Sequence, residues 1–274
     1  MRVGLKEELV KAQCLFAVGL AVGLAAPAAR AQNPAAPFIE VQDARFEVAL
    51  SWWLANMRGN IGIPRTVVGA NNTLSFTGDL GLGRTADAFI ARSRLFISEP
   101  LYVLLEYWRA RDEGRKTLRR DFFFDDTLFL QGSPATTVLE AQFAEAVLGY
   151  RIILWESVGV FILGGVNVNW FRMHIDTPTA SDHFSLTQVR PLIGITGQTN
   201  LFKWLSTYSR TAGYVDGCDT DNYLLETEIS LRVKIVRGLR AVVGYKSVWL
   251  QKQDLKEKFA FRSFGPFFGL NYAF

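Results

Sequence analysis

Cysteine and histidine are scarce, since the 274 residues include only two of each. Cys14 lies in an N-terminal segment that we expect to be removed, so Cys218 has no partner for an intrachain disulfide. The two histidines, His174 and His183, do not form a Cys/His cluster of the kind that binds metal. The sequence therefore predicts no metal site and no cofactor, and it assigns no role to Cys218.

Long apolar runs and a large net charge are also missing. The longest apolar candidate after the N-terminal segment, residues 158–168, is broken by glycines and followed by Asn169. It is too short for a membrane-spanning helix, which needs about 20 apolar residues. The formal net charge is only +4, which gives little support for binding to nucleic acid. Helical membrane proteins and nucleic-acid-binding proteins are therefore disfavoured.

The N-terminal 31 residues have the organisation of a secretory signal peptide. A positively charged start precedes a short apolar stretch at 14–26, and small residues at Ala29 and Ala31 frame a cleavage site before Gln32. The alternative is an uncleaved membrane anchor, although the apolar stretch is short for one. We expect residues 1–31 to be removed, 32–43 to form a short periplasmic segment, and 44–274 to form the folded domain.

The remaining chain alternates between apolar and polar residues with a period of two, which is typical of β-strands. In the clearest case, Tyr223, Leu225, Ile229 and Leu231 share one face, while residues that include Glu226 share the other. We expect an all-β fold, a transmembrane antiparallel up-and-down β-barrel of about twelve strands, with about ten as the fallback. The expected strands are 46–55, 74–82, 88–97, 101–111, 118–129, 138–152, 158–172, 184–198, 205–214, 222–233, 239–249 and 259–274.

Two features refine this expectation. In the strand at 138–152, Phe143 and Val147 are out of phase with Leu148 and Tyr150, and a β-bulge would explain the conflict. Aromatic residues near strand ends suit the girdle at a membrane interface, which favours a transmembrane barrel over a soluble β-sandwich or lipocalin-like barrel. The expected girdle residues are Trp52, Tyr107, Trp108, Tyr150, Trp170, Trp204 and Trp249.

The last predicted strand ends on an aromatic residue. Phe268, Leu270, Tyr272 and Phe274 fall on one face of it, and smaller or polar residues occupy much of the other. Such a strand resembles the closing strand of Gram-negative outer-membrane barrels, whose end is recognised by the barrel-assembly machinery. The resemblance implies export to the bacterial outer membrane, contact with outer-membrane lipid and lipopolysaccharide, and an assembly signal in these four residues.

Several short motifs together resemble a group of proteobacterial outer-membrane, porin-like barrel proteins that has no assigned activity. The resemblance implies architecture and location, not chemistry. The chain departs from the group's pattern at 122–124, where three phenylalanines stand in place of more polar residues. The matching motifs are 78–82 (GDLGL), the arginine-rich hairpin with Tyr107 and Arg109, 117–121 (TLRRD), 148–150 (LGY), 191–195 (PLIGI) and 264–270 (FGPFFGL).

Charged residues on the polar faces are the candidate functional residues of the lumen. They could line a polar conduit for small solutes and set its selectivity. Alternatively, they could pair across a narrow lumen and close it, which would leave a structural or surface barrel. The expected lumen-facing charges are Arg92, Arg94, Glu106, Glu226, Glu228, Arg232, Arg240 and Lys246.

One motif hints at an enzyme, although we expect none. His183 and Ser185 are two apart on a predicted strand and could form a base–nucleophile pair. This pair resembles the His-x-Ser of outer-membrane lipid A deacylases and phospholipases, so the alternative function is a lipid hydrolase. An orienting residue is missing from the pattern, because Asn200 and Asp216, the nearest candidates, are not well placed.

Overall fold

The computed structural model describes residues 45–62, 73–83, 85–124, 127–155, 157–216, 219–253 and 258–274. The expected signal peptide at 1–31, the segment 32–43 and Cys218 lie outside these described residues. Within the described part, no helix is long and apolar enough to cross a membrane.

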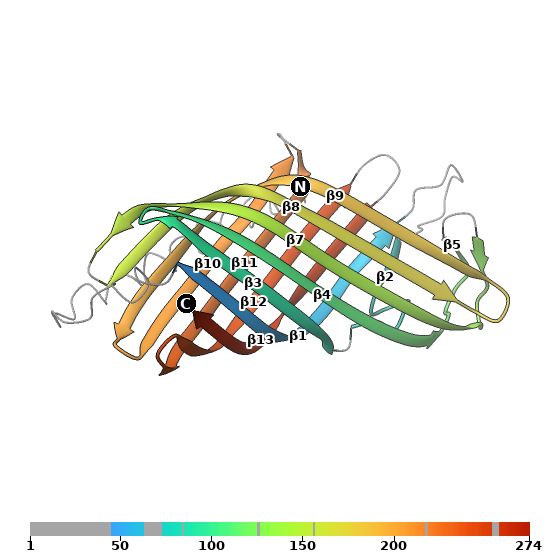
Figure 1. The fold of residues 1–274 in the computed structure, drawn as a ribbon. Helices are drawn as coiled ribbons and strands as arrows, with labels where there is room; N and C mark the ends of the chain where they lie inside the picture. Colours follow the sequence, from blue (N-terminus) through green and yellow to red (C-terminus); the bar gives the residue numbers. More distant parts are fainter. Residues whose placement is uncertain are drawn as a thin grey trace, which may run out of the picture.

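Ten strands of the described chain form one closed antiparallel up-and-down β-barrel, shown from the side in Figure 1. Each wall strand pairs with the next along the chain, and β13 pairs with β1 to close the sheet. Closure leaves no unpaired sheet edge around the wall. The wall strands are β1 (Phe46–Gly62), β3 (Thr85–Ser98), β4 (Leu101–Thr117), β7 (Pro134–Leu154), β8 (Val158–Asp176), β9 (Ser181–Phe202), β10 (Leu205–Asp216), β11 (Asp219–Val236), β12 (Leu239–Gln253) and β13 (Lys258–Ala273).

The expected fold class is confirmed with ten strands, while the preferred number of twelve is wrong. Of the expected strand at 74–82, only β2 (Thr73–Ser75) is a strand, and it pairs with the end of β1. The rest of this segment forms a turn, in which the Asp79 carboxylate accepts a 2.8 Å hydrogen bond from the Ser75 backbone N–H. Leu74, Phe76, Leu80 and Leu82 are buried, so the apolar alternation here serves packing and not a wall strand.

The expected strand at 118–129 is also absent from the wall. It contains β5 (Phe122–Phe124) and β6 (Thr127–Phe129), which pair only with each other in a small separate sheet. The rings of Phe122 and Phe129 stack with centroids 5.2 Å apart, and both are buried. Contacts such as that of Phe122 with Phe129 therefore stabilise a pair of short strands outside the barrel wall.

The wall has an apolar outer surface because successive side chains of a strand point to opposite faces. On β13, Phe268 and Leu270 point outward and are about half exposed, while Phe267 and Asn271 point inward and are buried. The same alternation runs around the barrel. Exposed apolar residues of this outer surface include Leu50, Trp52, Phe89, Leu95, Leu105, Leu148, Ile162, Val166, Val189, Ile193, Leu231, Val243, Phe268 and Leu270.

The two ends of the barrel differ. At one end, which we call the turn end, short connections such as Glu99-Pro100 and Arg237-Gly238 join the strands, and Arg45 and Phe274 lie together. At the other end, the extended end, lie β2, β5 and β6, and the β8–β9 hairpin projects beyond β10. β9 pairs with β8 as far as Ser181, but its pairing with β10 stops at Ile193.

Candidate functional site

The lumen holds all eight charges that were expected there. Arg94, Glu106, Glu226, Glu228, Arg232 and Lys246 are buried inside the barrel, and Arg92 and Arg240 are partly buried on inward-facing positions. Their strands, β3, β4, β11 and β12, present them inward because each occupies the same alternating set as buried neighbours such as Val242 and Val248.

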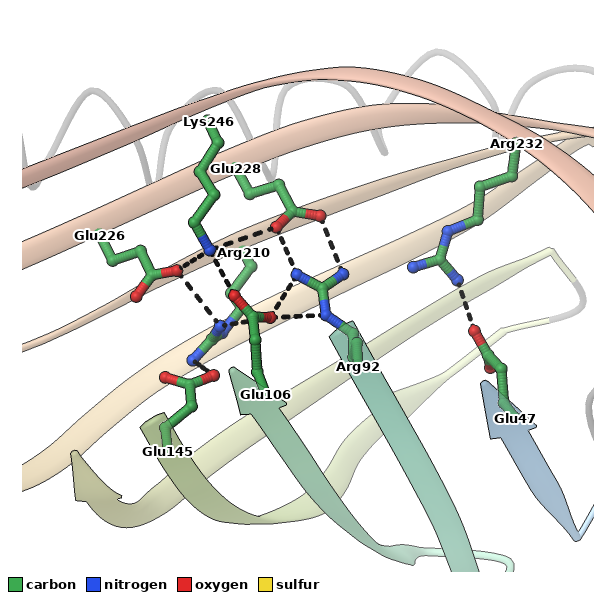
Figure 2. A network of polar contacts seen from close by, with 9 residues as sticks. All are labelled: Glu47, Arg92, Glu106, Glu145, Arg210, Glu226, Glu228, Arg232 and Lys246. Carbon is green, nitrogen blue, oxygen red and sulfur yellow. Dashed lines mark hydrogen bonds and ion pairs between the residues drawn. The ribbon is translucent and has the colours of Figure 1, made fainter. Parts of the chain in front are cut away.

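The centre of the lumen contains a network of ion pairs between opposite walls (Figure 2). The Lys246 ammonium contacts the carboxylates of both Glu106 and Glu226, and it lies 4.0 Å from Glu228. Arg92 donates two hydrogen bonds to Glu228, of 3.0 and 2.5 Å, and its Nε donates to Glu106 at 2.6 Å. This bidentate geometry is the stronger kind of arginine–carboxylate pairing.

Two members of the network were not predicted. Arg210 on β10 lies 2.6 Å from Glu145 on β7, and it lies 3.5 Å from Glu106. Arg210 was missed because its segment, STYSRTAGY, has no clear apolar face. Glu145 was missed because the inward face of its strand could not be identified.

The expected bulge near Phe143 is wrong. β7 keeps a regular register there, and its irregularity lies between Arg151 and Ile153. Phe143, Glu145 and Val147 all point inward and are buried, while Leu148 points outward. The apparent conflict arose because large apolar side chains occupy the lumen as well as the outer surface.

The centre of the network is almost completely shielded from solvent, since Lys246 has 0%, Arg210 1% and Glu226 1% of its surface exposed. Charges in such surroundings must be paired, because an isolated buried charge costs several kcal/mol or more. Most of this requirement is met, because three cations (Arg92, Arg210 and Lys246) lie among four carboxylates (Glu106, Glu145, Glu226 and Glu228), which leaves one carboxylate in excess.

A second charged cluster lies nearer the turn end. The carboxylate of Glu47 lies between Arg94 and Arg232, at 3.4 Å from each guanidinium, and it also accepts a hydrogen bond from Asn271. The ring of Tyr208 lies beside the same arginines, 4.3 Å from the Arg232 guanidinium carbon and 5.5 Å from that of Arg94. This cluster has one more cation than carboxylate, the reverse of the central network.

An aromatic cluster fills the lumen on the side of the extended end. Trp108 stacks on Phe143 with centroids 4.1 Å apart, and Trp53 meets Trp108 edge-on at 5.2 Å. Phe171 continues the cluster, 4.9 Å from Phe261. Trp108 was expected in the interfacial girdle, but it is buried inside the barrel, so that assignment is wrong.

The segment 73–83 covers the aromatic cluster. Phe76 packs against Phe259 with ring centroids 6.1 Å apart. Side chains from the rim hold the segment in place: Lys116 donates a 2.5 Å hydrogen bond to the Gly78 carbonyl, and Asp112 accepts one of 2.7 Å from the Gly83 N–H. The lumen is therefore filled by charged side chains at its centre and by aromatic rings beyond them.

His183 and Ser185 lie elsewhere, on the outer surface of β9 near the extended end. Both are exposed and border a groove of about 520 Å³, which is also lined by Arg172 and His174. No hydrogen bond joins His183 to Ser185 in the described chain. The carboxylate of Asp176 lies 2.7 Å from Nε2 of His174, while Asp182 accepts a hydrogen bond from the backbone N–H of His183 and not from its ring.

The expected partners of that pair do not complete a catalytic site. Asn200 pairs with Ser206 at the turn end, the opposite end of the strand from His183. The side chain of Asp216 lies outside the described residues. Among the residues that the structure describes, no group of three or more His, Cys, Asp or Glu residues could hold a metal ion.

Comparison with solved structures finds barrels of the same kind. The outer membrane protease OmpT from Escherichia coli is similar with a TM-score of 0.60 and 8% identity, over 84% of this chain and 96% of that chain. Lower scores link the chain to the translocator domain of the autotransporter NalP from Neisseria meningitidis (0.44, 11% identity, 98% and 97% covered) and to the attachment invasion locus protein Ail of Yersinia pestis (0.35, 11% identity, 83% and 98% covered).

No protein-family model matches the chain, and no curated protein matches it in sequence. At 8% identity, the likeness to OmpT concerns the fold and not the chemistry. The chain therefore has the closed antiparallel barrel architecture of bacterial outer-membrane proteins, with a lumen that is filled by its own side chains.

Proposed function

We propose that the chain is an outer-membrane barrel with a closed lumen, which acts as a structural or surface protein and not as an open porin or an enzyme. The observation that carries this proposal is the burial of the central ion-pair network, whose Lys246 has no exposed surface. The membrane location, the orientation and the partners below belong to the same proposal.

The outer surface supports a membrane location. A soluble protein covers its large apolar residues, but here residues such as Ile193 and Val189 are 72% and 63% exposed. The closed sheet pairs the backbone groups around the wall, which is the condition for strands to lie in hydrocarbon. We therefore expect the apolar outer surface to contact outer-membrane lipid and lipopolysaccharide.

The difference between the two ends supports an orientation. Barrels of this class have short periplasmic turns and longer external connections. On this basis the turn end, with Arg45 and Phe274, faces the periplasm, and the extended end with the β8–β9 hairpin faces outward. We further expect Phe268, Leu270, Tyr272 and Phe274, which project outward from β13, to be recognised by the barrel-assembly machinery.

An open conduit would require the network to separate. A small solute could pass only if Arg92, Arg210 and Lys246 left their carboxylate partners, and each charge would then need water or another partner. Liposome swelling tests this requirement. Liposomes that contain the refolded barrel should not swell in arabinose or glycine, whereas swelling above protein-free liposomes would support the small-solute channel instead.

A lipid hydrolase remains the second candidate, favoured by the outward groove beside His183 and Ser185. Outward-facing residues near the membrane boundary could reach a lipid ester without passing through the lumen. The test is turnover of phospholipid and of lipopolysaccharide by the refolded protein and by Ser185→Ala. We expect no turnover by either, and turnover that Ser185→Ala abolishes would establish the hydrolase.

A further inference from the structure

The charged cluster at the turn end has more cationic side chains than carboxylates. Arg94 and Arg232 share the single carboxylate of Glu47, and each guanidinium is 3.4 Å from it, which is long for a charge-assisted hydrogen bond. Arg240 adds a further positive charge at the mouth, where it sits directly opposite Asn271 in the register of β12 and β13. The local charge is therefore positive.

Five polar atoms of this cluster are buried without a hydrogen-bond partner among the described residues, and four of them can donate. The four are Nε of Arg94, Nε of Arg232, the Tyr208 hydroxyl and the Ser230 hydroxyl, and the fifth is the acceptor Oδ1 of Asn271. Tyr208 and Ser230 are directly paired across β10 and β11, and the Tyr208 ring lies beside both guanidiniums. A buried donor that is left unpaired costs about 1–3 kcal/mol, so four in one layer call for a bound group.

The chemistry of the cluster selects an anion. Guanidinium N–H groups only donate, and a hydroxyl can donate, so four of the five unpaired atoms favour an acceptor. A cation would find only the Glu47 carboxylate, which two arginines already share. Water could accept some of these hydrogen bonds, but it would not balance the excess positive charge.

The burial of the cluster limits the size of the ion that it can bind and the direction from which the ion can enter. Arg232 and Tyr208 are each only 2% exposed, so the layer suits a small ion and not a bulky organic acid. The Arg94 and Glu47 side chains keep 5% and 7% of their surface exposed. A small ion can therefore reach the cluster from the turn end, where these two side chains lie.

We propose that Arg94, Arg232, Tyr208 and Ser230 form a binding site for a small inorganic anion of halide size, which enters from the turn end. The anion accepts hydrogen bonds from the two Nε–H groups and from the two hydroxyls. Its charge balances the second arginine, which Glu47 alone does not neutralise.

The line width of chloride in NMR tests the proposal on the full-length barrel refolded in detergent micelles. Chloride that exchanges with a protein site has a broadened line, and bromide should compete for the site and remove the excess width. Arg232→Gln should lose most of the excess width. Arg58→Gln removes the same charge from an outward position on β1 and should keep it. The proposal is overturned if the wild-type protein gives no excess width, or if Arg232→Gln and Arg58→Gln behave alike.

A milder variant covers the case in which Arg232→Gln does not fold. Tyr208→Phe removes only the hydroxyl and keeps the ring beside the arginines. It should lower the chloride affinity about fivefold, the effect of one lost hydrogen bond. If Tyr208→Phe and Ser230→Ala both fold and bind chloride as the wild-type protein does, the hydroxyls do not contact an anion and the proposal is wrong.

Discussion

Lys246 of β12 contacts Glu106 of β4 across the lumen, between strands that are separated along the wall by β3, β1 and β13. A contact between opposite walls does more than neutralise two charges. It fixes the distance between the walls, and it occupies the space that a solute would need. In the proposed function, the contacts that brace the lumen (Figure 2) are also the ones that close it.

Lys246→Met tests the stabilising role of the network. The substitution keeps an unbranched side chain but removes the cation nearest to Glu106 and Glu226, which retain the more distant Arg210, and breaking a buried pair costs about 3–5 kcal/mol. We expect a lower urea midpoint for the refolded protein, measured by heat-modifiable gel migration. Lys203→Met, at an exposed position in the β9–β10 connection, is the matched control and should unfold with the wild-type protein. Equal midpoints for both variants would show that the network contributes no stability.

Phe143→Ala tests the aromatic cluster. Phe143 stacks on Trp108 and meets Phe171 edge-on at 5.5 Å, so its removal leaves a cavity inside the barrel. Such a truncation costs about 3–5 kcal/mol in a packed interior. Phe89→Ala removes the same side chain from the outer surface and should lower the urea midpoint less, because Phe89 is 43% exposed. The reverse order would mean that the lumen is not packed.

How much of the fold and of the lumen could be predicted from the sequence depends on the kind of residue. Period-two alternation correctly assigned the faces of β8 and β13 and placed residues such as Glu228 and Lys246 inside, because a polar side chain in this wall has only the lumen to occupy. It failed for Phe143 and Trp108, since an apolar side chain suits the lipid face and a packed lumen equally well. It also failed for Leu74 and Phe122, whose alternation belongs to packing outside the wall.

The sequence could not predict which charged side chains pair across the lumen, and the reason is geometric. Which side chains meet across a barrel depends on the strand number, the tilt and the stagger of the register. A change from twelve strands to ten alters all three. Arg210 and Glu145 lie 65 positions apart in the chain, and no local pattern links them.

Gly149→Ala tests a close approach inside the wall. The ring of Tyr102 lies over Gly149, and a Cβ added there would be 2.2 Å from the ring. Tyr102 is buried and also contacts Phe161, so it cannot easily move aside. We expect a reduced yield of folded barrel on heat-modifiable gels.

Gly164→Ala is the matched control for that experiment. Gly164 points outward on β8, and a Cβ there meets no atom within 4 Å among the described residues. This variant should fold like the wild-type protein. Normal folding of Gly149→Ala would show that Tyr102 does not pack on the glycine as described.

Deletion of Phe274 tests the assembly signal. The Phe274 N–H donates to the Phe46 carbonyl at 2.9 Å, and its carbonyl accepts from Arg45 at 3.1 Å, so the residue extends the contact between β13 and β1. We expect less folded, heat-modifiable protein in outer-membrane fractions. Phe274→Tyr keeps the ring and both hydrogen bonds and should assemble normally. Unchanged levels after the deletion would remove Phe274 from the assembly signal.

Planar-bilayer conductance of the refolded barrel, with folding verified by heat-modifiable migration, tests the closed lumen most directly. Because Lys246, Arg210 and Glu226 are paired and buried at the centre, we expect the folded wild-type protein to insert without unitary conductance steps. Reproducible unitary steps from the folded protein would contradict the closed lumen and would identify the barrel as a channel.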